Sequence, residues 1–378
     1  MNPHPTIPAS VQHTIEQALA RAGLDGRPGP LQGVTDTIRQ ALAGAGLADV
    51  FAPRRPAPSP TAAGGAEVID VVARDLGEHH SAPEPGVARG EGQFLRRRFT
   101  HPTGSRDYKL YLPAARAGAA SAAPLPLVVM LHGCTQSADD FAAGTQMNRL
   151  ADAHGLLVVY PEQPAGANPS RCWNWFRAED QVREGGEPAL IAGIVRAVAA
   201  EHPVDPRRIF VAGLSAGAAM AVILGETHPD LFAAVGVHSG LPYRSASDIP
   251  SALAAMKGRG AAAPTPTGRA VPTIVFHGDR DHTVQARNGE RVVEHATQAH
   301  GPQGLQVHTD TDTVPGGRRY TRRVHADAAG RPWVEWWILH GAGHAWSGGH
   351  ASGSYTDGSG PDASAEMLRF FLAQLPAP

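Results

Sequence analysis

The stretch "IFVAGLSAGAAMAVILGE", Ile209 to Glu226, places Ser215 between two glycines and surrounds it with alanines. Its core is the short pattern Gly-x-Ser-x-Gly, which a chain with 43 glycines can contain by chance. The other interpretation is that Ser215 lies on a turn too tight for larger side chains. The sequence on either side of the motif decides between the two.

The composition of the whole chain excludes several classes of protein. The chain has 378 residues, a formal net charge of -2 and a pI near 6.8, so its charge indicates neither a nucleic acid nor an anionic membrane as a partner. No apolar run is long enough to span a bilayer, and "MNPHPTIPASVQHTIEQALA" lacks the basic and apolar regions of a secretory signal. Two cysteines exclude a disulfide-dense scaffold, and no ligand pattern such as His-Glu-x-x-His occurs, so we expect no metal and no cofactor.

Shifts in composition predict a domain organisation. "TIEQALARAGL" (Thr14 to Leu24) recurs as "TIRQALAGAGL" (Thr37 to Leu47), and each copy is typical of a short helix that ends near a glycine. Two copies are too few for a solenoid, so we predict a helical N-terminal extension over residues 1–52. Residues 53–92 have the Pro, Ala and Gly content of a linker, and residues 93–378 are predicted to form the main domain.

The main domain alternates short apolar runs with helical stretches. Runs that are apolar on both faces suit a parallel sheet covered by helices on each side. The predicted strands are "LRRRFT", "RDYKLYL", "PLVVMLHG", "GLLVVYPE", "RIFVAG", "FAAVGVHSG" and "PTIVFHGD", with two more around a turn in "RRYTRRVHADAAGRPWVEWWILHG". The predicted helices are Pro188–Glu201, Ala216–His228, Ala286–His300 and "ASAEMLRFFLAQL", and Met256–Ala270 is expected to be an exposed loop. This alternation predicts an α/β fold with a mostly parallel central sheet flanked by helices.

Within this pattern the opening motif has the context of a nucleophile elbow. The strand "RIFVAG" leads directly to Ser215, and a helix begins with "AGAAMAVILGE". Gly213, Gly217 and the neighbouring alanines leave room for the helix to approach the strand closely. The small residues therefore permit a strained turn that lifts the Ser215 hydroxyl into a site.

A serine nucleophile needs a base, and the base needs an acid that orients it. In α/β-hydrolases the acid and then the histidine follow the serine along the chain. After the strand "PTIVFHG" both Asp279 and Asp281 are candidates; we favour Asp281, which lies farther into the loop, and expect Asp279 to stabilise that loop. The predicted base is His344, in the glycine-rich "GAGHAWSGG" after the last strand.

The alkoxide that forms during ester cleavage needs hydrogen-bond donors, normally two backbone N–H groups. One should come from Ala216, directly after the nucleophile. The other should come from the loop after an earlier strand, where Cys134 of "MLHGCTQ" is the candidate. The alternative for this segment is an ordinary turn at the end of a strand.

Several segments together resemble the poly(3-hydroxybutyrate) depolymerase family of esterases, an α/β-hydrolase group that also includes feruloyl and acetylxylan esterases. They are "LHGCTQ", "CWNWF", "VDPRRIFVAGLSAGAAM", "FAAVGVHSGLPY" and "GAGHAWSGG". The resemblance covers Phe94 to Leu375 and implies an α/β-hydrolase catalytic domain. It also implies that Ser215, Asp281 and His344 form the triad, with Cys134 and Ala216 as oxyanion donors.

The resemblance carries further expectations outside the triad. It implies a disulfide between Cys134 and Cys172; the alternative is two unrelated buried thiols. It also implies that Trp175 of "CWNWF" lines the substrate cleft, and Trp346, beside the base, is a second candidate; for both, the alternative is packing in the core. Ser347 stands where many relatives have proline, and we expect it to loosen the loop after His344.

These observations predict a serine hydrolase that cleaves carboxylic esters through an acyl-enzyme. The expected substrate is a short-chain polyhydroxyalkanoate, its oligomers or a small ester; the runner-up is a feruloyl or acetylxylan esterase. From a different class, the chain could be an inactive hydrolase fold used as a binding module. The resemblance and the cysteine pair favour an extracellular location, whereas the lack of a readable signal peptide favours the cytoplasm. The sequence does not indicate an oligomeric state.

Overall fold

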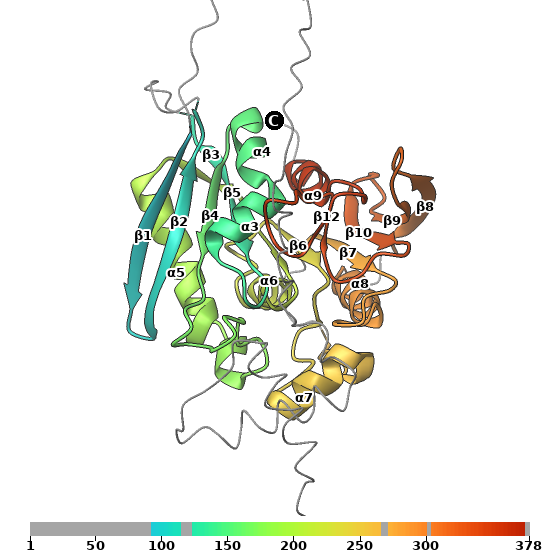
Figure 1. Cartoon of the computed structure of the whole chain (residues 1–378), viewed down its shortest axis with the longest axis horizontal. Coiled ribbons are helices and arrows are strands. Elements are labelled where there is room, and N and C mark those ends of the chain that lie inside the picture. Colours follow the sequence, from blue (N-terminus) through green and yellow to red (C-terminus); the bar gives the residue numbers. More distant parts are fainter. Residues whose placement is uncertain (1–91, 115–122, 266–270, 301–303, 375–378) are drawn as a thin grey trace, which may run out of the picture. The chain divides into compact units, whose positions relative to one another are not determined.

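A ten-stranded mixed sheet organises the chain (Figure 1). The computed structural model describes residues 92–114, 123–265, 271–300 and 304–374. The strand order is β1-β2-β4-β3-β5-β6-β7-β10-β9-β8, and every pair from β4 through β10 is parallel. Antiparallel strands flank this parallel centre on both sides. The predicted N-terminal extension and most of the predicted linker lie outside the described residues.

The parallel strands have mostly apolar sequences, and the outer strands β1, β8 and β9 are more polar. Their bounds are β1 Gln93–His101, β2 Gly104–Leu112, β3 Leu125–Leu131, β4 Leu157–Pro161, β5 Val204–Leu214, β6 Ala234–His238, β7 Thr273–Gly278, β8 Gln306–Thr313, β9 Arg319–Ala326 and β10 Pro332–Leu339. Every residue of β4, β6 and β7 is buried, as expected for parallel strands that are covered on both faces. A separate two-stranded ribbon pairs β11 (Trp346–Ser347) with β12 (Thr356–Asp357).

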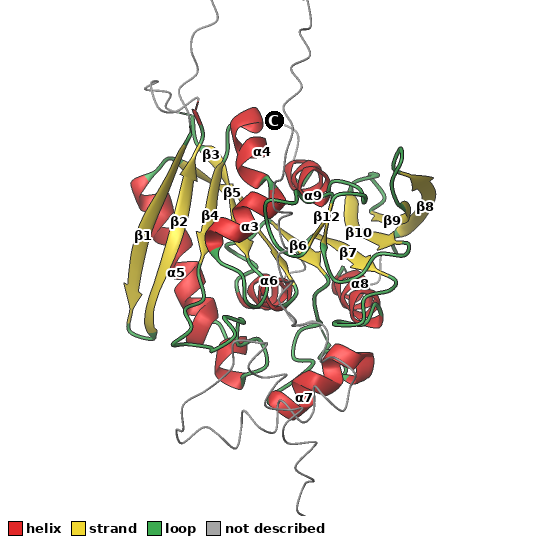
Figure 2. Cartoon of the chain, in the orientation of Figure 1, coloured by secondary structure: helices red, strands yellow, loops and turns green. Residues whose placement is uncertain are grey.

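Helices cover both faces of the sheet (Figure 2). One buried apolar cluster joins the sheet to α5 (Gly186–Glu201), α6 (Ala216–Thr227) and α8 (Arg287–Ala299). The other joins the opposite face to α3 (Ala138–Thr145), α4 (Met147–His154) and α9 (Ala363–Leu372). The result is a three-layer α/β arrangement, so the predicted fold class is confirmed. Among the described helices, none is long and apolar enough to cross a membrane.

Several segments differ from the prediction, and α3, α4 and the β11–β12 ribbon are among the elements that the sequence pattern did not predict. Strand β8 was not predicted, because its sequence "QVHTDTDT" offers no apolar face and all of its residues are exposed at the sheet edge. The expected loop Met256–Ala270 begins within a helical segment, because α7 (Ile249–Ala254) continues into a π-helical turn, Ala255–Arg259. Ala255 and Gly258 are buried there, which anchors the start of this segment on the core.

The apolar core predicts that the main domain folds by itself. All of the buried apolar residues of the described structure lie between Tyr108 and Phe371. Deleting residues 1–91 should therefore give a protein whose Tm lies within about 4 °C of the full chain, the shift expected from roughly 1 kcal/mol. Thermal melts followed by circular dichroism measure this. A truncated chain that is insoluble or has lost its cooperative transition would show that the first 91 residues are part of the core.

Candidate active site

Ser215 lies on a strained turn between β5 and α6. Its backbone has φ 58° and ψ -118°, a conformation that residues with a Cβ rarely adopt. The turn is held on both sides, because the Ser215 N–H donates to the His238 carbonyl (2.9 Å) and the Ser215 carbonyl accepts from the Ala219 N–H (2.9 Å). This is the strand–turn–helix geometry that the motif predicts.

The two glycines of the motif are explained by close contacts of the backbone. A Cβ on Gly217 would lie 2.1 Å from the Leu131 carbonyl oxygen and 2.6 Å from that of His132. A Cβ on Gly213 would lie 2.4 Å from the Gly217 carbonyl carbon. Because all of these neighbours are backbone atoms, they cannot move aside as a flexible side chain would. Helix α6 therefore starts in direct contact with β5 and with the end of β3.

Asp281 holds His344 in one orientation. The His344 Nδ1–H donates to Asp281 Oδ2 at 2.7 Å, and Asp281 Oδ1 accepts from the N–H groups of Thr283 (2.9 Å) and Val284 (2.8 Å). With Nδ1 protonated, Nε2 of a neutral His344 is free to accept a proton. The Asp281 side chain is fully buried, and His344 keeps 12% of its side chain exposed. The pair thus combines a shielded carboxylate with an imidazole that is partly exposed.

The charge state of Asp281 follows from its contacts. Burial alone raises the pKa of this carboxyl, but the hydrogen bond and charge of His344, followed by His277 and the Val284 N–H, outweigh it, so the pKa is lowered. His277 donates from Nε2 to the Val284 carbonyl (2.7 Å), and its own pKa is lowered, chiefly by burial. Asp281 therefore stays ionised at neutral pH and can stabilise a protonated His344.

Asp279 has a different set of partners. Its Oδ2 accepts from His340 Nδ1 at 3.0 Å, and its Oδ1 accepts from the Gly341 N–H at 2.7 Å. These contacts join the end of β7 to the end of β10. They support the interpretation in which Asp279 stabilises the loop and Asp281 orients the base.

His238 connects the Ser215 turn to the His344 loop. Its carbonyl accepts from Ser215, and its Nε2 accepts from the Ser347 N–H at 3.0 Å. Burial, together with the nearby charges of His277 and His344, lowers the pKa of His238 to about 3. The ring is therefore neutral at physiological pH and can serve as this acceptor.

The expectation that Ser347 loosens the loop after His344 is wrong. The Ser347 N–H is the donor to His238, and the Ser347 hydroxyl donates to the Pro361 carbonyl at 2.8 Å. A proline has no N–H and could make neither bond. At this position serine fixes the loop by hydrogen bonding.

The candidate oxyanion donors lie at two neighbouring strand ends. Ala216 is the first residue of α6, where backbone N–H groups have no partner within the helix. Cys134 follows β3, and the predicted disulfide with Cys172 is present. A backbone hydrogen bond from Thr135 to the Ser170 carbonyl (2.7 Å) fastens the same two loops together.

The tryptophans near the site differ in their exposure. Trp346 is 1% exposed, stacks on His238, and donates from Nε1 to Ser364 Oγ at 3.0 Å, so the packing alternative describes it. A side chain enclosed in this way cannot line a substrate cleft. Trp175 is 7% exposed and is also a buried residue of the apolar core, so its contact with substrate stays a prediction.

The candidate triad residues and the candidate oxyanion donor Cys134 all follow the carboxyl ends of parallel strands. Cys134 comes after β3, Ser215 after β5, Asp281 after β7 and His344 after β10. These strands belong to the parallel part of the sheet, with β6 between β5 and β7, so their carboxyl ends lie at one edge, where open α/β sheets bind ligands. Among the described residues, no group of three or more His, Cys, Asp or Glu could hold a metal ion.

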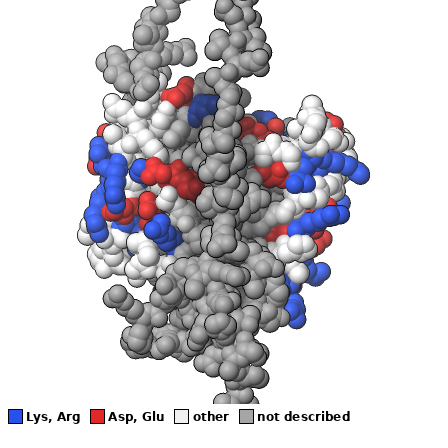
Figure 3. Space-filling model, in the orientation of Figure 1, with Lys and Arg blue, Asp and Glu red and all other residues white. Residues whose placement is uncertain are grey.

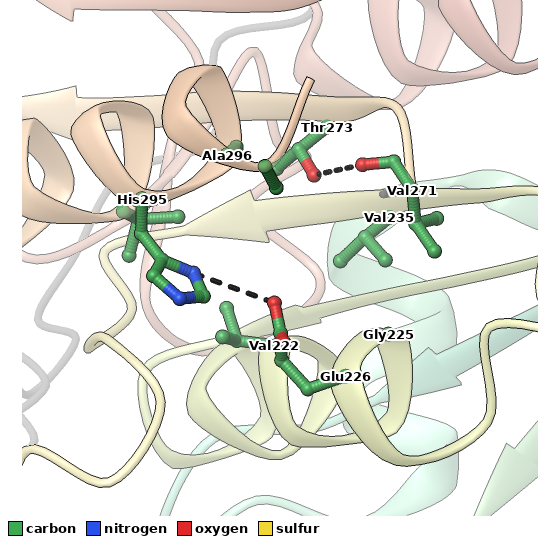
Figure 4. A pocket seen from close by; sticks show the side chains of 10 residues that line it. Val222, Gly225, Glu226, Val235, Val271, Thr273, His295 and Ala296 are labelled. Atoms are coloured by element: carbon green, nitrogen blue, oxygen red, sulfur yellow. Dashed lines mark hydrogen bonds and ion pairs between the residues drawn. The ribbon is translucent and has the colours of Figure 1, made fainter. Parts of the chain in front are cut away.

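A small cavity elsewhere is separate from this edge (Figure 4). It has a volume of about 30 Å³ and lies where α6 ends and where β6 and β7 begin, at the amino ends of the strands. His295 of α8 forms an ion pair with Glu226 of α6 across it, at 3.3 Å. A cavity of this size has room for little more than a water molecule, so it is a packing feature between two helices.

The described surface carries both kinds of charge on the face shown in Figure 3. On the face shown in Figure 3, the described basic and acidic side chains are interspersed over both flanks of the molecule. Several of the basic ones have acidic partners, such as Arg96 with Asp107 on β2 and Arg183 with Asp230. This pattern agrees with the near-neutral net charge of the sequence.

The fold and this strand-edge arrangement define an α/β-hydrolase. The family model described as Esterase PHB depolymerase matches residues 106–302, and the chain belongs to that family. Poly(3-hydroxyalkanoate) depolymerase C of Paucimonas lemoignei is 37% identical over 231 residues, which cover 58% of this chain and 54% of that protein. The poly(3-hydroxybutyrate) depolymerase of Ralstonia pickettii is 28% identical over 242 residues, covering 59% of this chain and 48% of its own length.

Relatives with a different named activity also match. Acetylxylan esterase A of Aspergillus oryzae is 29% identical over 182 residues, covering 43% of this chain and 58% of that protein. The solved acetyl xylan esterase from Aspergillus awamori has a TM-score of 0.55 at 19% identity, covering 75% of this chain and all of that one, which shows the shared fold. The chain spans about half the length of the curated relatives it matches.

The contacts of the two aspartates predict unequal effects of substitution. Asp281→Asn should lower kcat about 10⁴-fold, as the equivalent change does in a serine protease, because an amide cannot fix the His344 tautomer and stabilise its protonated form. Asp279→Asn should cost less than about tenfold, because it alters only the contacts between two strand ends. Steady-state hydrolysis of p-nitrophenyl butyrate measures both. A larger loss for Asp279→Asn would reverse the assignment.

Proposed function

We propose that this chain is a serine esterase with Ser215 as nucleophile, His344 as general base and Asp281 as the acid that orients it. The observation that carries the proposal is the 2.7 Å bond from His344 Nδ1 to the buried Asp281, formed at the strand edge where Ser215 occupies a strained turn. That bond is the orienting half of a triad, and it leaves His344 Nε2 to accept a proton.

The proposed reaction proceeds through an acyl-enzyme. Ser215 Oγ attacks the ester carbonyl while His344 Nε2 takes its proton, and the N–H groups of Cys134 and Ala216 stabilise the negatively charged oxygen. The protonated His344 then gives its proton to the leaving alcohol. Water, activated by the same histidine, releases the acid and restores the serine. This mechanism requires no cofactor.

The proposed substrate is a short-chain polyhydroxyalkanoate, its oligomers or a small ester. Membership of the Esterase PHB depolymerase family supports it, as does the 37% identity to a protein named poly(3-hydroxyalkanoate) depolymerase C. A second candidate is an acetylated or feruloylated polysaccharide, because acetylxylan esterases match in both sequence and fold. The disulfide between Cys134 and Cys172 supports an oxidising location such as the extracellular space.

An inactive binding module is the contrasting class of function. It requires none of the groups that the site retains. The strained Ser215 backbone has a stability cost that a binding module has no reason to maintain.

Substitution of the nucleophile tests the proposal. Ser215→Ala should reduce hydrolysis of p-nitrophenyl butyrate by at least about 10⁴-fold without lowering the Tm, since the hydroxyl acts only in the reaction. Ser245→Ala is a matched control, because its buried Oγ has no hydrogen-bond partner among the described residues. Activity of Ser215→Ala within tenfold of the wild type would rule out the mechanism.

The substrate class is tested separately with the wild-type protein. Hydroxybutyrate oligomers should be cleaved with a higher kcat/KM than methyl ferulate or acetylated xylan. The reverse order would select the polysaccharide esterase.

A further inference from the structure

One buried carboxylate lies close to the site without belonging to the triad. Glu187, in the first turn of α5, has only 3% of its side chain exposed. Nothing in its sequence context, "REGGEPAL", distinguishes it from an exposed acidic residue at the start of a helix. Its burial therefore needs an explanation from its partners.

All of the side-chain contacts of Glu187 are with donors. Oε2 accepts from the Asn174 backbone N–H at 2.7 Å. Oε1 accepts from Asn174 Nδ2 at 2.8 Å, from Gln163 Nε2 at 2.5 Å and from Arg106 Nη2 at 3.3 Å. This set of donors favours the ionised carboxylate, because a protonated one would turn its own O–H toward a donor.

The position of Glu187 at the start of α5 is itself held in place. Asp180 Oδ1 accepts from the Glu187 backbone N–H at 2.7 Å, and a Cβ on Gly186 would collide with that oxygen. Burial, and then the charge of Asp180, raise the pKa of Glu187, while the hydrogen bonds from Asn174 and Gln163 act in the opposite direction. The hydrogen bonds from Asn174 and Gln163 therefore favour the ionised form of Glu187, and Glu187 in turn holds these two residues in place.

Gln163 extends the network to the loop that carries Cys134. Its Nε2 donates to the Cys172 carbonyl at 2.8 Å as well as to Glu187, and its backbone N–H donates to His132 Nε2 at 3.1 Å. Cys172 is joined to Cys134 by the disulfide, and His132 is two residues before Cys134. Two routes therefore lead from Gln163 to the candidate oxyanion donor.

His132 transmits this restraint directly to the end of β3. Its Nδ1 donates to the Gly133 carbonyl at 2.7 Å, and its own carbonyl accepts from Trp173 Nε1 at 3.1 Å. Burial lowers the pKa of His132 to about 4, so the ring is neutral and can accept from Gln163 at physiological pH. The residues on both sides of the disulfide are thereby linked to each other and to Gln163.

We propose that Glu187 is a positioning residue for the oxyanion hole, and that its carboxylate, through Asn174 and Gln163, sets the location of the Cys134 N–H. This inference rests on the proposed esterase function, because an oxyanion hole acts only if the ester carbonyl is attacked there. Glu187 lies behind the site and acts through its hydrogen-bonded neighbours.

The proposal predicts which kinetic constant changes. The oxyanion donors stabilise a charge that develops in the transition state, so a misplaced Cys134 N–H lowers kcat while KM changes little. If Glu187 instead only held Trp175 against the substrate, substitution of Glu187 would raise KM and leave kcat unchanged. The two constants therefore separate positioning of the oxyanion donor from positioning of a substrate contact.

Glu187→Gln is the test, because glutamine keeps the shape but replaces one acceptor oxygen with a donor. We expect kcat for p-nitrophenyl butyrate to fall about tenfold to hundredfold, with KM within about threefold of the wild type. Glu335→Gln is the matched control, since Glu335 of β10 is a fully buried carboxylate that binds Arg322 of β9 and Arg369 of α9. That variant should lower the Tm and leave kcat within about twofold.

A second variant covers the case in which Glu187→Gln does not fold. Gln163→Met removes the link from Glu187 to Cys172 but leaves the bonds between Glu187 and Asn174. It should lower kcat, as Glu187→Gln does. Wild-type kcat in a folded Glu187→Gln protein, or in Gln163→Met, would overturn the inference and leave the esterase function standing. A wild-type protein that hydrolyses no ester would instead overturn the proposed function, and this inference with it.

Discussion

The contact between the start of α6 and the ends of β3 and β5 is the constraint on which the site depends. Gly217 approaches the carbonyl of Leu131 so closely that no side chain fits between them. This contact forces Ser215 into a positive φ and brings the N-terminus of α6 beside the loop of Cys134. The proposed nucleophile and both candidate oxyanion donors are therefore positioned by one close approach of backbone to backbone.

The rest of the site is built around that contact by the sheet and by buried imidazoles. Parallel strands deliver Asp281 and His344 to the same edge, and His238 bonds both the Ser215 turn and the His344 loop. His132 has the corresponding role on the Cys134 side. Both rings are kept neutral by burial, so they act as fixed acceptors, whereas His344 keeps part of its side chain exposed.

The sequence alone predicted those parts of the structure that depend on local pattern. Apolar runs located the parallel strands, and the small residues around Ser215 predicted the elbow. The pattern could not reveal β8, whose polar residues form a strand only because β9 offers an edge to pair with. The sequence pattern also missed Glu187 and misjudged Trp346 and Ser347, for a related reason. The role of each comes from a partner outside its local sequence: Gln163 for Glu187, Ser364 for Trp346 and His238 for Ser347.

Chemical labelling can show whether Ser215 is the activated serine. A fluorophosphonate reacts with a serine that a neighbouring base activates, and peptide mapping by mass spectrometry locates the modified residue. The account predicts a single adduct on the peptide that contains Ser215, which is lost when the protein is denatured before labelling. An unlabelled protein, or an adduct on a serine outside the β5–α6 turn, would contradict it.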